Sequence, residues 1–136
     1  MLIDSHAHLE MREFDSDRND VIERAELAGI DCIVTVGTNP GLSRKALSIA
    51  HQYENIYATV GVHPHDVAKA SDKSFDELKA LAQDPKVVAY GEIGLDYFRN
   101  ISPREKQIEM FAKQLDLAQE LNLPVIIHDR DAHEET

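Results

Sequence analysis

Short apolar runs alternate along this chain with stretches of helical periodicity. The runs lie at residues 2–3, 32–36, 56–60, 87–90 and 124–127, and most are rich in β-branched residues. Each run is apolar at consecutive rather than alternating positions, which is typical of a strand buried on both faces in a parallel sheet. The pattern therefore predicts five strands of a sheet that is covered on both sides.

Two of the stretches between these runs show apolar residues at helical spacing. The first ends before Gly29, which suits the position after a helix C-terminus. Its apolar positions are Val21, Ile22, Ala25 and Ala28. The positions of the second are Leu42, Ala46, Leu47, Ile49, Ala50 and Tyr53. Both patterns predict amphipathic helices.

Two further helices are predicted from signals at their first residues. The segments 74–77 (SFDE) and 102–105 (SPRE) both match the capping box, and Pro103 suits the first helical position. The second helix continues as a long amphipathic one through Ile108, Phe111, Leu115, Ala118 and Leu121. The predicted order is βαβαβαβαβ, which requires right-handed crossovers and a parallel α/β fold, either doubly wound or a (β/α) barrel.

Length and composition limit the class of protein. A chain of 136 residues with 43% hydrophobic residues is the size of one globular domain. We expect it in the cytoplasm and outside the membrane, because no signal-like leader opens the sequence and no apolar run approaches the roughly 18 residues of a membrane span. The single cysteine, Cys32, allows no internal disulfide. A formal net charge of −11 makes metal cations the natural counter-charge of any acidic site.

Histidines and one glutamate recur where the predicted strands end. In an extended chain, His6 and His8 project to the same side while Ala7 points away. The third strand leads to His63 and His65, the fourth to Glu92, and the fifth to His128 and Arg130. These are the carboxyl ends of parallel strands, where barrels and open α/β sheets place their sites. We therefore expect the side chains to meet at one rim.

The residue types indicate a metal site. Imidazole and carboxylate ligands suit Zn, Mn, Fe or Mg, and Glu92 could bridge two cations that generate hydroxide from a shared water. Hydrolysis is the chemistry that such a site favours. The alternatives are that His6 and His8 are ordinary surface histidines, and that Glu92 forms an ion pair with Arg99 or Lys86. Gly91 and Gly94 would allow a close backbone approach or a sharp turn beside Glu92.

Four segments together resemble one family. They are 4–10 (DSHAHLE), 61–65 (GVHPH), 91–97 (GEIGLDY) and 126–130 (IIHDR), which occur in this order across the whole chain. They resemble the TatD-related metal-dependent deoxyribonucleases, which have a TIM-barrel fold of the metallo-dependent hydrolase type. The His-x-His segment alone would indicate only the wider amidohydrolase-like group.

The resemblance implies roles for individual residues. Two divalent ions, drawn from Zn, Mg and Mn, would be held by His6, His8, Glu92 and His128, with Glu92 as the shared ligand and the catalytic residue. His63, Asp96 and Arg130 would lie near the substrate phosphate. Other roles remain open for these three: His63 could cap its own turn, Asp96 could orient a ligand histidine, and Arg130 could pair with Asp129 or Asp131.

The resemblance also sets expectations for the whole protein. A TIM barrel needs eight strands and about 250 residues, so we expect residues 1–136 to be the N-terminal part of a single TIM-barrel hydrolase domain, with about five of its strands. An open sheet edge would allow self-association. The expected reaction is cleavage of DNA phosphodiester bonds, with exonucleolytic release of nucleotides by a water that two metal ions activate. The alternatives are a metal-dependent ester or amide hydrolase, such as a D-aminoacyl-tRNA deacylase, and a non-catalytic metal-binding module.

Overall fold

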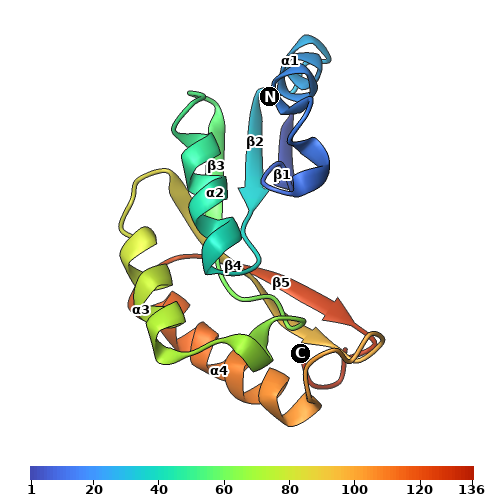
Figure 1. The fold of residues 1–136 in the computed structure, drawn as a ribbon, viewed down its shortest axis with the longest axis vertical. Coiled ribbons are helices and arrows are strands. Elements are labelled where there is room, and N and C mark those ends of the chain that lie inside the picture. Colours follow the sequence, from blue (N-terminus) through green and yellow to red (C-terminus); the bar gives the residue numbers. More distant parts are fainter.

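A computed structural model describes residues 1–136 as five parallel strands joined by four α-helices (Figure 1). The strands are β1 (Ile3–Ala7), β2 (Cys32–Val36), β3 (Ile56–Val60), β4 (Val87–Asp96) and β5 (Val125–Arg130). The helices between them are α1 (Arg18–Leu27), α2 (Pro40–Ala50), α3 (Asp72–Leu81) and α4 (Arg104–Glu120). Two short 3₁₀ turns, Arg12–Phe14 and Val67–Lys69, precede α1 and α3. The predicted alternation of strands and helices is confirmed.

The sheet has the order β1-β2-β3-β4-β5, and every neighbouring pair is parallel. Sequential order of this kind is that of a (β/α) barrel and not that of a doubly wound sheet, in which the strand order reverses. Helices α2, α3 and α4 lie together on one side of the sheet (Figure 1). The chain is therefore part of a barrel wall, with its helices outside.

Strand exposure differs from the sequence prediction at the two edges of the sheet. We expected every strand to be buried on both faces, and β2, β3 and β4 are largely buried. However, the prediction is wrong for β1, which is exposed at four of its five positions, and for β5, where Val125 and Ile127 are each 39% exposed. These two strands have a neighbour on one side only. Their apolar residues Ile3, Val125 and Ile127 are therefore exposed at the open edges of the sheet.

Two predicted helix starts also differ from the structure. Helix α3 begins at Asp72 with Ser71 as the N-cap, and Ser74 is the third helical residue of that capping box instead of its first member. Helix α4 begins after Pro103, and Ser102 does not cap it. The hydroxyl of Ser102 instead donates to the carbonyl oxygen of His65 and accepts from the backbone N–H of Ala68. Ser102 thus bonds to the segment after β3, although the local pattern predicted it as the N-cap of α4.

Two buried glutamines connect α4 to the strand ends. The side chain of Gln114 accepts from the backbone N–H of Val62 at 2.8 Å and donates to the carbonyl oxygen of the same residue at 3.0 Å. Gln107 likewise accepts from the N–H of Asp96 at 2.8 Å and donates to the carbonyl oxygens of Asp96 and Ser102. Because these backbone groups are buried, the glutamines supply partners that no neighbouring strand provides. They hold the loops after β3 and β4 in place.

A lipid bilayer would not be spanned by any helix of this structure, since none combines the necessary length with the necessary apolar character.

We predict that Gln114→Ala lowers the free energy of unfolding by about 2–4 kcal/mol, because it leaves the buried N–H and carbonyl groups of Val62 without partners at about 1–3 kcal/mol each. Gln119→Ala, at an exposed position of the same helix, should change it by less than about 0.5 kcal/mol. Urea unfolding followed by circular dichroism measures both. Equal effects of the two substitutions would show that the contact with Val62 contributes nothing.

Candidate metal centre

Three side chains meet at the carboxyl ends of the strands: His6 from β1, His8 from the position just after β1, and Glu92 from β4. His6 Nε2 and His8 Nε2 are 3.3 Å apart, and both face Glu92 Oε2, at 3.5 and 3.8 Å. Two ligands of one tetrahedral ion at about 2.0–2.1 Å from it lie about 3.4 Å apart. The spacing of the two imidazole nitrogens thus matches that of two ligands of one cation. The predicted projection of His6 and His8 to one side is confirmed.

A second group of side chains faces the other oxygen of Glu92. His128 Nδ1, from β5, lies 3.0 Å from Glu92 Oε1, and His63 Nε2 lies 3.1 Å from the same nitrogen. Potential ligand atoms of His63, Glu92 and His128 all lie within 4.8 Å of one another, as do those of His6, His8 and Glu92. Glu92 is therefore common to two clusters and presents one oxygen to each.

Hydrogen bonds fix which nitrogen of His8 faces Glu92. His8 Nδ1 lies 3.0 Å from both Glu10 Oε1 and the carbonyl oxygen of Val36. An ionised carboxylate and a carbonyl group can only accept, so His8 Nδ1 carries the proton and, in the neutral ring, Nε2 presents a lone pair. Lone pairs that face a carboxylate repel it unless a cation lies between them. The donor set around His8 and Glu92 therefore fits a metal ion.

Glu10 is a functional residue that the sequence reasoning missed. Its carboxylate is fully buried, bonded to His8 through Oε1 and to the Thr35 hydroxyl through Oε2 at 2.7 Å. The same hydroxyl accepts from the backbone N–H of Leu9. A carboxylate behind a ligand histidine orients the ring and raises its basicity. The sequence pattern did not indicate this contact, because Leu9 and Glu10 form a turn after β1 and do not continue the strand.

The second cluster contains a similar arrangement around His128. His128 Nε2 lies 3.0 Å from Asp96 Oδ2, to which His65 Nε2 is also bonded at 2.7 Å. Asp96 Oδ1 accepts from the backbone N–H of Arg99 at 2.7 Å. The buried carboxylate of Asp96 thus fixes His128 with Nδ1 directed at Glu92. His65 was expected at this rim but was given no role from the sequence, and its bond to Asp96 places it in this network.

His63 has a different protonation pattern. Its Nδ1 accepts the backbone N–H of His65 at 3.1 Å, so a neutral His63 carries its proton on Nε2. Burial lowers the pKa of His63 to about 4, which keeps the ring neutral near pH 7. His63 therefore caps its own turn, the open alternative of the sequence analysis, and at the same time offers an N–H donor to the cluster.

The ion pairs considered as alternatives for Glu92 and Arg130 do not form in the structure. Glu92 forms no ion pair with Arg99 or Lys86; the ammonium of Lys86 instead donates to the carbonyl oxygens of Tyr53, Glu54 and Ile56. Arg130 forms no ion pair with Asp129 or Asp131, and its guanidinium carbon lies over the ring of Phe98 at 4.0 Å from the centroid. Arg130 thus contacts the segment that follows β4 through Phe98.

The close approach of β4 and β5 depends on Gly94. A Cβ atom at this position would lie 2.0 Å from the carbonyl oxygen of His128, and the φ angle of Gly94 is +143°. Only glycine fits such a position. Pairing between the two strands is irregular between Tyr90 and Ile93, the segment that contains Glu92. Such irregularities redirect side chains at active sites, so Gly94 serves the strand packing that brings His128 to Glu92.

The charges of the site are balanced by neighbouring groups. The hydrogen bond to Glu10 raises the pKa of His8, and the hydrogen bond to Glu92 raises the pKa of His128, in both cases against the effect of burial. Burial would raise the pKa of Glu92, but His128, His63 and His6 lower it overall. A proton on either histidine occupies the place that a cation would take, so metal binding must release protons.

Comparison with known proteins identifies relatives along the whole chain. Residues 3–136 match the profile of the family described as TatD related DNase. The chain is 43% identical over 135 residues to an uncharacterised metal-dependent hydrolase, YabD, of Bacillus subtilis, and 44% identical over 133 residues to the 3'-5' ssDNA/RNA exonuclease TatD of Salmonella typhimurium. These alignments cover 99% and 98% of this chain but only 53% and 51% of the relatives.

Solved structures agree with the sequence matches. YjjV, a TatD homologue from Escherichia coli, superposes with a TM-score of 0.91 at 36% identity, and a TatD-family hydrolase from Entamoeba histolytica with a TM-score of 0.90 at 30% identity. Each covers 98% of this chain, which covers 52% and 51% of the two structures. The chain therefore spans about half the length of the relatives it matches, and its five strands have the fold of TatD-type TIM barrels.

We predict that Glu10→Ala weakens the binding of Zn²⁺ or Mn²⁺ by about 10- to 100-fold, because His8 loses the carboxylate that orients it. Glu13→Ala removes the same charge from an exposed position nearby and should leave the affinity unchanged. Isothermal titration calorimetry of the three proteins measures the difference. Equal metal affinities for Glu10→Ala and Glu13→Ala would contradict the role of Glu10.

We predict that Asp96 stabilises the fold in an acid-sensitive way. Burial opposes ionisation, but the hydrogen bonds from Arg99 N–H, His65 and His128 lower the pKa of Asp96 to about 2. Because the pKa is lower in the folded state, this stability is present above the unfolded value near 3.8 and is lost as pH falls through about 2. The unfolding free energy of the metal-free protein minus that of Asp96→Asn should therefore fall by about 2 kcal/mol between pH 5 and pH 2. A pH-independent difference would contradict this.

Proposed function

Because this chain belongs to the TatD-related DNase family, we propose that the protein is a hydrolase that uses two divalent metal ions to cleave phosphodiester bonds of DNA from a strand end. The observation that carries the proposal is the position of Glu92, which presents one oxygen to His6 and His8 and the other to His128. The family match and the name of the Salmonella relative, a 3'-5' ssDNA/RNA exonuclease, support a nucleic-acid substrate.

The residues divide into two sets of ligands. His6 and His8 would hold one ion, His128 would hold the other, and Glu92 would contribute to both. Divalent ions such as Zn²⁺, Mg²⁺ or Mn²⁺ would supply Lewis acidity, which makes water nucleophilic near neutral pH and polarises phosphoryl oxygens. The buried carboxylates of Glu10 and Asp96 orient the rings of His8 and His128 through the nitrogens that face away from Glu92.

His63, Asp96 and Arg130, which were expected near the substrate phosphate, would each have a different role. His63 Nε2 carries an N–H group at the edge of the second cluster, so His63 is suited to donate to a non-bridging phosphate oxygen as charge develops there. Asp96 acts through His128 and His65 because both of its oxygens are already bonded. Arg130 lies two residues after His128 in β5 and would contact the nucleic-acid strand beyond the scissile phosphate.

The proposal extends to the whole protein. Residues 1–136 would form the N-terminal part of a single TIM-barrel domain, since the chain covers about half of each relative and β1 and β5 are the two edges of its sheet. Exposed apolar residues on or next to these edge strands include Leu2, Ile3, Val125 and Ile127. On a separate 136-residue chain, these open edges would favour self-association. We place the protein in the cytoplasm.

We predict that Glu92→Gln lowers the metal-dependent hydrolysis of single-stranded DNA by the whole protein at least 1000-fold, because an amide cannot supply one anionic oxygen to each ion. Glu109→Gln, at an exposed position of α4, should retain full activity. Release of acid-soluble nucleotides measures the rate, and an aminoacyl ester assayed in parallel tests the alternative bond. Full DNase activity of Glu92→Gln, or cleavage of the ester but not of DNA, would refute the proposal.

A further inference from the structure

Two aromatic side chains beyond the end of β4 each carry an arginine on their ring. The guanidinium of Arg130 lies 4.0 Å from the centroid of Phe98, and that of Arg104 lies 3.8 Å from the centroid of Tyr97. Phe98 is 60% exposed, although phenylalanine is usually buried. A single exposed aromatic residue needs no explanation. Here, however, the exposed ring and the guanidinium stacked on it together form a flat surface that carries a positive charge.

This surface lies beside the metal centre. Phe98 follows Asp96 by two residues and Arg130 follows His128 by two, and Asp96 and Arg130 are partners in the β4–β5 register. The backbone N–H of Tyr97 donates to the carbonyl oxygen of Arg130 at 2.9 Å, so the two strands remain paired up to this point. Two residues of a β-strand span about 7 Å. One nucleotide of an extended, single-stranded nucleic acid covers this distance.

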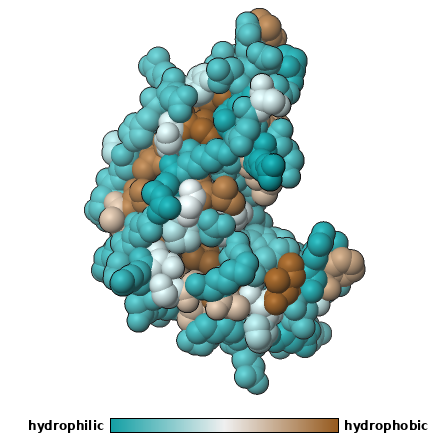
Figure 2. Space-filling model, in the orientation of Figure 1, coloured by the Kyte–Doolittle hydropathy of each residue, from teal (hydrophilic) through white to brown (hydrophobic).

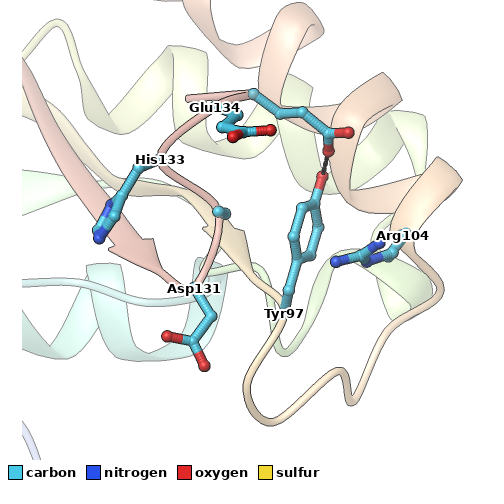
Figure 3. A pocket seen from close by; sticks show the side chains of 7 residues that line it. Tyr97, Arg104, Asp131, His133 and Glu134 are labelled. Carbon is cyan, nitrogen blue, oxygen red and sulfur yellow. Dashed lines mark hydrogen bonds between the residues drawn. The ribbon is translucent and has the colours of Figure 1, made fainter.

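The second aromatic–arginine pair, Tyr97 and Arg104, borders an acidic pocket beside this surface, and the lining of that pocket does not include Phe98 or Arg130. Figure 3 shows Tyr97 and Arg104 at a pocket of about 320 Å³ that is also lined by Asp131, Glu134 and Glu135. The hydroxyl of Tyr97 is bonded to Glu135, and His133 to Asp129. These carboxylates repel a phosphate, whereas a nucleobase stacks on aromatic rings and on guanidinium planes regardless of its sequence.

The outer shape of the molecule is consistent with this position. In Figure 2, hydrophobic surface is visible on the lobe at the lower right, where Figure 1 shows the ends of β4 and β5. The exposed apolar residues of the loop after β4 are Phe98 and Ile101, at 60% and 57%. Only Phe98 of these two carries an arginine.

We propose that Phe98 and Arg130 form a base-stacking subsite that binds the nucleotide next to the scissile phosphate of a single-stranded nucleic acid. The inference rests on the proposed function and adds to it a means of selecting unpaired ends. At a duplex end the terminal base is held by pairing with its partner and by stacking on its one neighbour, so it must unpair before it can turn onto protein side chains. The subsite therefore favours single strands over duplex ends.

The test compares oligonucleotides with and without a terminal base. Binding of a fluorescein-labelled single-stranded oligonucleotide to the whole protein is measured by anisotropy in EDTA, which prevents metal-dependent cleavage. One oligonucleotide is intact, and others are abasic at the terminal nucleotide of either end. The unsubstituted protein should bind the intact strand about tenfold more tightly than one of the abasic strands. Phe98→Ala should bind all of them equally, at the affinity of the abasic complex.

Two further variants complete the comparison. Phe98→Tyr retains the ring and should restore the tenfold preference, whereas Ile101→Ala removes an equally exposed side chain from the same loop and should leave the preference unchanged. Lack of any preference for an intact end in the unsubstituted protein would overturn the proposal, even if Phe98→Ala does not fold. A preference that persists in a folded Phe98→Ala protein would overturn it as well.

A substrate without a terminal base separates this inference from the proposed function. The abasic strands keep their phosphodiester bonds but lack a terminal base, so the unsubstituted protein should still hydrolyse them with Mn²⁺. Failure to hydrolyse both the intact and the abasic strands would refute the proposed phosphodiesterase. Hydrolysis of both, without any preference in binding for the intact strand, would refute the stacking subsite alone.

Discussion

The carboxylate of Glu92 is the group on which the site depends. One oxygen faces two imidazoles from β1 and the other faces an imidazole from β5, although these histidines are more than a hundred residues apart in sequence. Lone pairs of His8 and His128 converge on this one negative group, an arrangement that is unfavourable unless positive charge lies between them. Protons can supply that charge, because the pKa values of His8 and His128 are raised, and a metal cation can supply it as well. The arrangement therefore fits a bound cation.

The rest of the chain keeps these groups in place. Buried carboxylates behind His8 and His128 determine which nitrogen each ring presents, and the glycine at position 94 lets β5 approach β4 closely enough for His128 to reach Glu92. Gln107 and Gln114 bind the backbone of the loops that carry Asp96 and His63. Such a scaffold limits the movement of the ligands, which is the requirement for binding an ion with defined geometry.

Periodicity was sufficient to predict the alternation of strands and helices, but it left a doubly wound sheet and a (β/α) barrel open. The resemblance to the TatD-related family indicated the barrel. The bounds of β2 and β3 were predicted to the residue, because their apolar runs are short and are limited by polar or turn-forming residues. Strand β4 extends to Asp96, six residues beyond the predicted end at residue 90. The prediction relied on a continuous run of apolar residues, and the polar residues Glu92 and Asp96 interrupt that run. The exposure of β1 and β5 depends on neighbours that no local pattern records. Glu10 was missed and His65 was given no role, because their contacts with His8 and Asp96 become visible only in three dimensions.

The ligand roles of His6, His8, Glu92 and His128 remain predictions, which metal spectroscopy of the whole protein tests most directly. The protein is loaded with Mn²⁺, its metal content is determined by mass spectrometry, and its electron paramagnetic resonance spectrum is recorded. If one carboxylate serves two ions, the protein should bind two equivalents of Mn²⁺ and show the spectrum of an exchange-coupled pair, which Glu92→Gln abolishes. A single equivalent, or two ions with the spectrum of isolated Mn²⁺, would contradict the account.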